Sequence, residues 1–198
     1  SETKQESLRL MHAEARRMSR MVSNILELAE LETRGLTVKH LLDFRALAAE
    51  VVAELQPFAQ ERAIELTLDS DESVCWVNGE AYHLKQVLLN LTDNAIKYSR
   101  PHDRVEISLA RDLSRKKIVC QVSDTGPGIP AEHLPHLPRR FYRAASEETS
   151  GSGLGLALVE AILKLHDSAL EMDSRTDEPT GTVMRFALDA TQEKAERA

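Results

Sequence analysis

Three short segments occur in a fixed order along this 198-residue chain, and they constrain its fold more than any other feature. The first carries two asparagines and a lysine, the second an aspartate and two glycines, and the third three glycines. They read Asn90-Leu-Thr-Asp-Asn94-Ala-Ile-Lys97-Tyr98-Ser99, Asp124-Thr-Gly126-Pro-Gly128 and Gly151-Ser-Gly153-Leu154-Gly155-Leu156. Side-chain oxygens, a cation and backbone N–H groups near a helix start together favour a site for an anionic ligand.

The first segment lies on a predicted helix from Glu80 to Ser99, whose apolar residues recur at helical spacing. Asn90, Asn94 and Lys97 are four and three residues apart, so they share one face of that helix. Carboxamide oxygens suit Mg²⁺, and a lysine adds a point charge for phosphate. A solvent-exposed polar face is the alternative, and this segment alone does not decide between the two.

The other two segments have ordinary explanations when each is taken alone. Asp124 follows an apolar strand pattern, and the two glycines after it permit close approach of a ligand or simply form a turn. The third segment precedes a helical pattern, so free N–H groups and the helix dipole face a potential anion. It matches neither a Walker A loop nor a dinucleotide-binding unit, and three alternating glycines are weak evidence by themselves.

Composition limits the partners and the compartment. A formal net charge of -7 argues against a nucleic-acid partner. Cys75 and Cys120 stand in apolar stretches without metal-ligand neighbours, which indicates buried free thiols in a reducing environment. No apolar run reaches the about 18 residues that a membrane span requires. We therefore expect a cytoplasmic chain that makes no membrane contact itself, although a longer parent protein can still be anchored in the inner membrane.

The first 34 residues predict a long helix with one apolar seam. Its seam positions alternate by three and four: Leu8, Met11, Ala15, Met18, Val22, Ile25 and Ala29. This is the spacing of a coiled coil or helical bundle. Leu26, Leu28 and Leu31 widen the stripe, as expected where the helix meets more than one neighbour. Because a lone helix of this kind is marginal and nothing else in the chain repeats the seam, we predict a homodimer through this helix.

Residues 35–190 alternate helix and strand patterns, and 191–198 read as a polar tail. Asp43 is a good N-cap for a helix to Phe58, with an irregularity at Pro57. A further helix spans 154–165. Strand patterns occupy 64–68, 74–77, 105–109, 118–122, 170–172 and 183–188. Helices with a mixed sheet of about five strands predict an α+β fold, a two-layer sandwich.

Taken together and in this order, the three segments resemble the N, G1 and G2 boxes of an ATP-binding domain. Sensor histidine kinases, DNA gyrase, mismatch-repair ATPases and a heat-shock chaperone share that domain. Arg140-Phe141-Tyr142-Arg143 resembles the F box specific to the kinases. The resemblance implies the Bergerat-type fold, with ATP and Mg²⁺ as cofactors. In the family a flexible lid lies between the second and third segments, here from about Pro130 to Ser150. Pro138 departs from the family pattern, which usually has a phenylalanine there, and this departure leaves the packing of the lid open.

The resemblance also implies roles for single residues. Asn90 and Asn94 would hold the metal and the phosphates, Lys97 would reach phosphate, and Tyr98 would pack near adenine. Asp124 would accept a hydrogen bond from the adenine N6 amino group. In the lid, Phe141 would pack onto the core and Arg143 would approach the terminal phosphate, although a surface arginine is nearly as plausible. The remaining predicted nucleotide contacts are Gly126, Gly128, Ile129, Gly151, Gly153, Leu154, Gly155, Leu156 and Thr182.

One position separates the branches of the family. The hydrolytic ATPases carry a water-activating glutamate where this chain has Asn90, and a carboxamide is a poor general base. The segment from Leu8 to Glu32 resembles the second helix of the kinases' dimerisation hairpin. His12 lacks the neighbours of a phosphoacceptor, which we therefore place on an upstream helix. His133 and His136 are three residues apart, but no third metal ligand is evident.

These features predict the catalytic part of a sensor histidine kinase. Phosphate would pass from ATP to a histidine upstream, and then to the aspartate of a response regulator receiver domain. Two alternatives stay open: a protein-serine kinase of the anti-sigma-factor type, and a non-enzymatic module in which nucleotide controls dimer docking.

Overall fold

The structure is a computed structural model that describes residues 11, 15, 18, 19, 21–31, 33, 38–71, 75–144 and 152–191. Residues 21–31 form one helix. The elements that follow are β1 (His40–Asp43), α2 (Phe44–Glu61), β2 (Glu65–Ser70), β3 (Trp76–Gly79), α3 (Ala81–Tyr98), β4 (Arg104–Asp112), β5 (Lys117–Asp124), η1 (Leu134–His136), α4 (Gly155–Leu165), β6 (Glu171–Arg175) and β7 (Gly181–Asp189).

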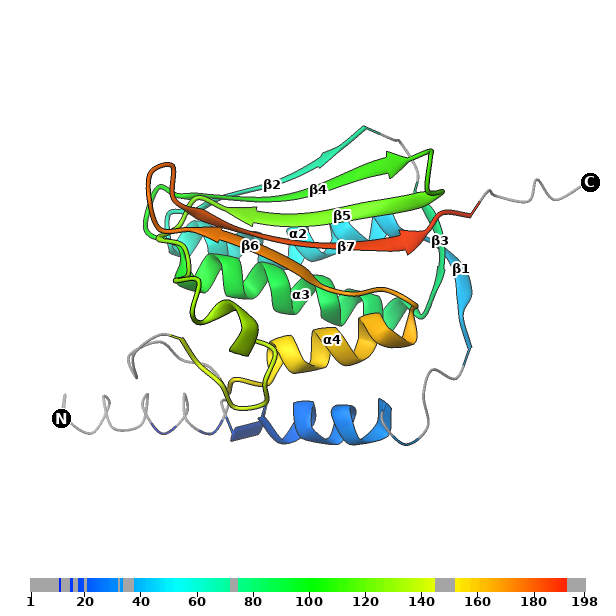
Figure 1. The fold of residues 1–198 in the computed structure, drawn as a ribbon, viewed down its shortest axis with the longest axis horizontal. Helices are drawn as coiled ribbons and strands as arrows, with labels where there is room; N and C mark the ends of the chain where they lie inside the picture. Colours follow the sequence, from blue (N-terminus) through cyan, green and yellow to red (C-terminus); the bar gives the residue numbers. More distant parts are fainter. Residues whose placement is uncertain are drawn as a thin grey trace, which may run out of the picture.

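The main sheet has five strands in the order β2-β4-β5-β7-β6. β2 and β4 are parallel, and the other neighbours are antiparallel. The helices α2, α3 and α4 cover one face of this sheet, and the helix of residues 21–31 lies on their far side (Figure 1). The predicted α+β fold, a two-layer sandwich with a mixed five-stranded sheet, is confirmed.

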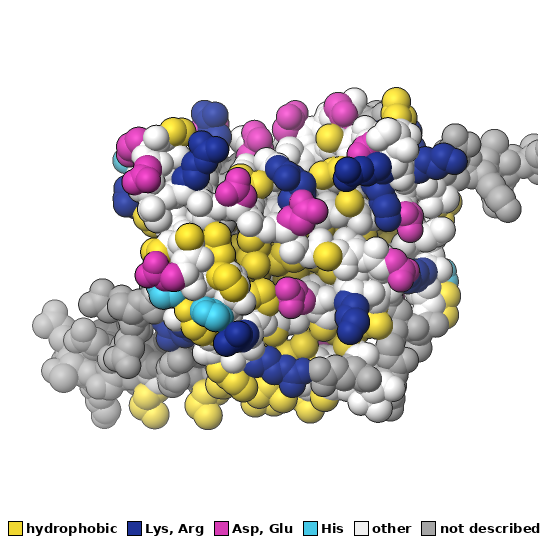
Figure 2. All heavy atoms as spheres, in the orientation of Figure 1, with side chains coloured by type: hydrophobic (Ala, Val, Ile, Leu, Met, Phe, Trp, Pro, Cys, Tyr) yellow, Lys and Arg dark blue, Asp and Glu magenta, His cyan; other side chains and the backbone are white. Residues whose placement is uncertain are grey.

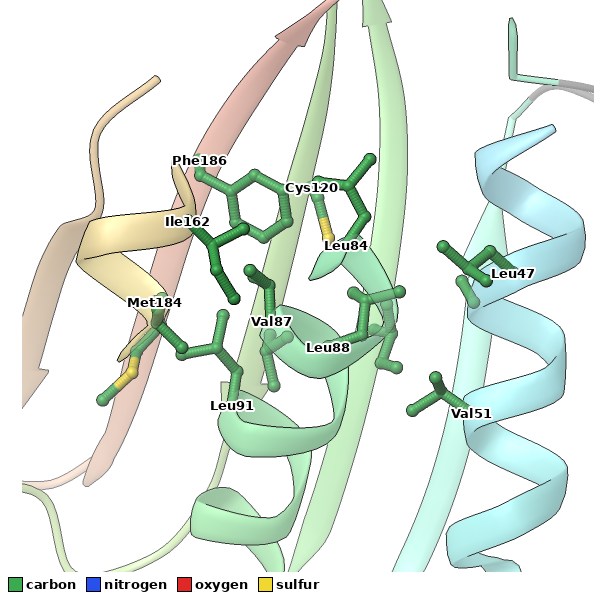
Figure 3. Close-up of a cluster of buried hydrophobic side chains, with 14 of the residues drawn as sticks. Leu47, Val51, Leu84, Val87, Leu88, Leu91, Cys120, Ile162, Met184 and Phe186 are labelled. Carbon is green, nitrogen blue, oxygen red and sulfur yellow. The ribbon is translucent and has the colours of Figure 1, made fainter. Parts of the chain in front are cut away.

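The core lies between this sheet and the helices. Apolar residues recur at helical spacing in α2, α3 and α4, and they point toward the apolar side chains on the inner face of the strands (Figure 3). Phe44 at the start of α2 meets Phe186 of β7 edge-on, with ring centroids 6.1 Å apart. Both side chains are fully buried, and burying a phenylalanine stabilises a fold by about 1.5–3 kcal/mol. Cys75 and Cys120 are buried free thiols, as predicted.

Three local features differ from the prediction. β1 was not predicted, because a strand of four residues is too short to show a clear alternation and its pairing partner β3 is distant in sequence. β3 joins β1 in a separate two-stranded sheet instead of the main sheet. α2 contains Pro57 and runs to Glu61, past the predicted end at Phe58. The N-cap at Asp43 is confirmed by its bond from the Arg45 N–H at 3.0 Å.

The helix of residues 21–31 packs on the domain with one side and exposes the other. Leu28 and Leu31 are buried in the common core. The seam residues Met18, Val22 and Ile25 are 61%, 56% and 44% exposed. Hydrophobic side chains line the lower edge of the molecule, where this helix lies (Figure 2). Leu28 and Leu31 of the widened stripe thus meet the chain's own domain, whereas Leu26 is exposed, and pairing of the seam with a second copy stays a prediction.

Several predicted features lie outside the described residues. They are Leu8 of the seam, the boundary between residues 34 and 35, Gly151 and the tail from residue 192. Among the helices that are described, none has the length and apolarity needed to cross a membrane.

Candidate functional site

A cleft of about 650 Å³ opens between α3, the loop before α4 and the ends of β5 and β7. It gathers most of the predicted site residues: Asn90, Asn94, Lys97, Tyr98, Asp124, Gly128, Ile129, Arg143, Gly153, Gly155, Leu156 and Thr182. Gly126, Leu154 and Phe141 do not line it. The three sequence segments therefore converge on one cleft, although they are far apart along the chain.

The sheet register builds one end of the cleft. Asp124, the last residue of β5, stands opposite Thr182 of β7. The Asp124 carboxylate accepts hydrogen bonds from the Gly126 N–H at 2.9 Å and from the Thr182 N–H. Burial nevertheless raises the pKa of Asp124 to about 6, because desolvation outweighs these two bonds. Gly126 thus acts by orienting Asp124 and not by lining the cleft.

Gly128 fixes the loop after Asp124 against the hairpin of β6 and β7. Its φ is +74°, and a β-carbon here would stand 1.9 Å from the Arg175 carbonyl oxygen. The next residue, Ile129, donates its N–H to the Ser174 hydroxyl at 2.8 Å. Only glycine permits both the left-handed backbone and this close approach. Ser174 was missed from the sequence, because its partner segments are distant along the chain.

Asn90 stands at the other end of the cleft, beside the start of α4. Its side-chain Nδ2 donates to the Gln86 carbonyl at 2.8 Å, which leaves Oδ1 on the opposite side. A β-carbon on Gly155 would lie 2.6 Å from that oxygen, so the glycine makes room for the amide. The N-cap residue of α4 is Leu154, whose side chain makes no capping hydrogen bond. The cleft therefore meets both an oriented carboxamide oxygen and the positive end of a helix dipole.

Lys97 is held by a residue that the sequence analysis did not select. Its ammonium forms an ion pair with Asp93, one helical turn earlier, and both side chains line the cleft. The signal was available in the sequence, since an acidic residue four positions before a lysine favours such a pair. In this arrangement the lysine charge is directed at Asp93, and its contact with phosphate stays a prediction.

The lid segment differs from the prediction at Phe141. Phe141 has a left-handed φ of +65°, and its ring is 59% exposed, so the predicted packing of the ring on the core is wrong for this structure. The backbone makes the contact instead: the Phe141 N–H donates to the Gly153 carbonyl at 2.8 Å. This left-handed turn directs the ring outward.

Tyr142 takes the inward position beside Phe141. It lines the cleft, and its hydroxyl is 2.6 Å from Nδ1 of His133. The His136 ring is 5.5 Å from the Tyr142 ring. Both histidines thus contact a tyrosine, and the described residues include no group of three His, Cys, Asp or Glu side chains that could hold a metal ion.

The N-terminal helix also contributes to the cleft. Ser23, Asn24 and Glu27 line it, and none of them was selected from the sequence because they lie off the apolar seam. Burial, together with the charges of Glu30 and Glu80, raises the pKa of Glu27. The carboxylate of Glu27 therefore forms part of the cleft wall, although it comes from a segment far from the other lining residues along the chain.

Comparison with known proteins identifies the class to which this fold and cleft belong. The family model described as "Histidine kinase-, DNA gyrase B-, and HSP90-like ATPase" matches residues 79–192, and the chain belongs to this family. The matched region contains all three sequence segments, so the residues of these segments that line the cleft belong to the family's ATPase domain.

Within this family the chain is similar to sensor histidine kinases. The sensor histidine kinase YkoH of Bacillus subtilis is 33% identical over 190 residues, covering 94% of this chain and 40% of YkoH. The chain therefore spans less than half of that relative. The structure of the mycobacterial sensor histidine kinase MprB aligns with a TM-score of 0.66 and 29% identity, covering 77% of this chain and 98% of the other. Histidine kinase ThkA, solved in complex with the response regulator protein TrrA, shares the fold, with a TM-score of 0.77 and 21% identity over 98% of this chain and 53% of the other.

Proposed function

We propose that this chain is the ATP-binding catalytic portion of a sensor histidine kinase. It would transfer the γ-phosphoryl group of ATP to a histidine on an upstream helix of the full protein. The observation that carries the proposal is the single cleft that joins Asp124, Asn90 and the start of α4. Residues 1–34 would be the second helix of the dimerisation hairpin and 35–190 the catalytic domain, in the cytoplasm where ATP is available.

The base would lie at the Asp124 end and the phosphates at the Asn90 end. An ionised Asp124 accepts a hydrogen bond from an exocyclic amino group, and Tyr98 and Ile129 offer apolar surface to a ring. The first turn of α4 supplies free N–H groups to the phosphates. Arg143, on the lid side of the cleft, would balance the charge of the terminal phosphate.

The residues present fit a magnesium ion. Asn90 turns its Oδ1 toward the start of α4, and Asn94 lies one helical turn further along the same cleft wall. Carboxamide oxygens are hard ligands of the kind that Mg²⁺ accepts beside phosphate oxygens. When bound, Mg²⁺ neutralises phosphate charge and so favours phosphoryl transfer. The chain's own part is to hold the phosphates and exclude water, since Asn90 is not a general base.

Replacing Gly155 with alanine tests the phosphate end. The added methyl group would stand 2.6 Å from the Asn90 Oδ1 and displace it, so the affinity for Mg-ADP should fall about tenfold. Alanine favours helix formation over glycine by about 1 kcal/mol, so the melting temperature should not fall. Calorimetric titration and thermal melts check both results. Unchanged Mg-ADP affinity would remove Asn90 from the site.

The pKa of Asp124 predicts how nucleotide affinity depends on pH. The ionised carboxylate is a stronger acceptor for the adenine amino group than the protonated carboxyl, so ADP affinity should fall as the pH drops through about 6. Inorganic pyrophosphate, which has no base, is the control for ionisation of the phosphates. If ADP and pyrophosphate show the same pH profile, Asp124 does not read the base.

The same shift has the opposite effect on the fold without ligand. The pKa of about 6 lies above the ordinary aspartate value of 3.8, so folding favours the protonated carboxyl. Its contribution to stability is fully present below pH 3.8 and is lost as the pH rises through about 6.

A transfer assay tests the proposed reaction. The chain would be mixed with Mg-ATP labelled at the γ-phosphate and with a separately produced hairpin that carries the acceptor histidine. The bond from the γ-phosphorus to the bridging oxygen breaks, a nitrogen–phosphorus bond forms on the imidazole, and ADP leaves. Acid-labile, base-stable label on the hairpin supports the proposal. Phosphoserine would indicate the anti-sigma-factor type of kinase, and binding without transfer a regulatory module.

The same proposal includes two protein partners, a second copy of the chain and a response regulator receiver domain. Phosphohistidine is an intermediate that must pass its phosphate on, and ThkA has been solved with such a regulator. The exposed seam on residues 18–25 supports the homodimer.

The double substitution Val22→Glu and Ile25→Glu tests the dimer seam. Both side chains are exposed, so the substitution should leave the melting temperature within a few degrees while it converts a dimer to a monomer. Leu28→Ala is the matched control, because Leu28 is 3% exposed and faces the chain's own core. It should lower stability by about 2–4 kcal/mol. Sedimentation that shows the same association state for wild type and the double variant would contradict the dimer seam.

A further inference from the structure

Three polar side chains form one row across the sheet at the base end of the cleft. Asp124 of β5 stands opposite Thr182 of β7, and Thr182 stands opposite Ser174 of β6. Directly opposed residues of neighbouring strands are close enough to interact. Asp124 and Thr182 line the cleft itself, and Ser174 lies behind them.

The hydroxyl of Ser174 has three hydrogen-bond neighbours. The Ile129 N–H is 2.8 Å from it, the Gly181 carbonyl oxygen 3.0 Å and the Thr182 hydroxyl 3.0 Å. A serine hydroxyl has one hydrogen and two lone pairs. The carbonyl can only accept, so it takes the serine hydrogen, and the N–H can only donate. The remaining lone pair must then accept from Thr182.

This arrangement engages the donors that stand in and beside this row. The N–H groups of Gly126 and Thr182 bond to Asp124. The Ile129 N–H and the Thr182 O–H bond to Ser174. What these groups leave for a ligand are acceptors, namely the carboxylate of Asp124 and the hydroxyl oxygen of Thr182.

We propose that Ser174 is a specificity-determining residue, which holds the Thr182 hydroxyl as an acceptor and so makes the site prefer 6-amino over 6-oxo purines. This inference rests on the proposed nucleotide site. A 6-oxo purine places an acceptor oxygen where adenine has its amino group, and two facing acceptors form no hydrogen bond. Without Ser174, the Thr182 hydroxyl is released and rotates to donate to that oxygen.

The test compares the affinities of ADP and inosine diphosphate by calorimetric titration. The two ligands share their phosphates, and inosine differs from adenosine by its 6-oxo group and by the hydrogen on N1 that accompanies it. In Ser174→Ala, the preference for ADP should fall about tenfold, the equivalent of one hydrogen bond. Ser168→Ala is the matched control, because the Ser168 hydroxyl also accepts from a backbone N–H, that of Ala187, at 3.3 Å. It should leave the preference unchanged.

A double variant separates this role from simple loosening of the loop. Ser174→Ala combined with Thr182→Val has no hydroxyl left to donate, so the preference for ADP should rise again toward that of wild type. A merely structural role of Ser174 would give no such recovery. If Ser174→Ala does not fold, Ser174→Cys takes its place, since a thiol is a weak acceptor and should also lower the preference.

The outcomes distinguish the inference from the proposed function. Wild-type chain that binds neither ligand contradicts the nucleotide site itself. Wild type that prefers ADP, with an unchanged preference in the folded Ser174 variant or no recovery in the double variant, overturns the role of Ser174 alone.

Discussion

Asp124→Asn should weaken ADP binding by about 100-fold or more, because the change replaces an acceptor by a donor where the base is read. The asparagine oxygen would keep the bond that Oδ1 now accepts from Gly126, so the side-chain NH₂ takes the place of the other carboxylate oxygen. A hydrogen bond to a charged group contributes about 1.5–3 kcal/mol, and two facing amino groups add a desolvation cost. Calorimetric titration with ADP measures the loss.

The melting temperature of the Asp124→Asn variant is the control that separates lost binding from lost folding. Burial disfavours the ionised carboxylate, so removing the charge at pH 7.5 should leave the melting temperature equal to or above that of wild type. If the variant is fully folded and binds ADP more weakly, the loss of affinity arises in the binding site and not from unfolding. An Asp124→Asn variant that binds ADP as tightly as wild type would show that the base is read elsewhere.

Gly153→Ala should have a comparable effect through the lid. Gly153 has φ +68°, and a β-carbon here would lie 2.7 Å from the Phe141 carbonyl carbon. Backbone atoms cannot turn aside as a flexible side chain can, so the contact between the lid and the loop before α4 must open. Strain of this kind costs about 1–3 kcal/mol. We expect Mg-ADP affinity to fall at least tenfold, measured by titration, while the core stays folded.

Phe141→Ala is the matched control for this contact. The ring is 59% exposed and does not line the cleft, and the backbone bond to Gly153 does not need it. The alanine variant should therefore bind Mg-ADP within about threefold of wild type. A strong loss in Phe141→Ala, with little change in Gly153→Ala, would mean that the ring and not the backbone couples the lid to the nucleotide.

Local patterns predicted those parts of the site that a single element presents. Asn90, Asn94 and Lys97 share a helix face because their spacing is helical, and this needs no knowledge of the rest of the chain. Asp124 and Gly128 follow directly from a strand and a turn. Gly153 and Gly155 were likewise placed by their position before a helix.

Pairings between distant segments were not predictable in this way. The row of Asp124, Thr182 and Ser174 depends on the register of three strands, which local alternation does not specify. The outward ring of Phe141 depends on a left-handed backbone that phenylalanine rarely adopts. The sequence predicted a widened apolar stripe on the N-terminal helix, but only the structure shows that Leu28 packs on the domain.

The central claim is that this cleft binds Mg-ATP, and thermal unfolding of the chain with a non-hydrolysable ATP analogue and Mg²⁺ tests it most directly. A ligand that binds only the folded chain, at 100 times its dissociation constant, should raise the free energy of unfolding by about 2.7 kcal/mol. The Asp124→Asn variant should show almost none of this stabilisation. Equal melting temperatures of the wild-type chain with and without saturating analogue would contradict the account.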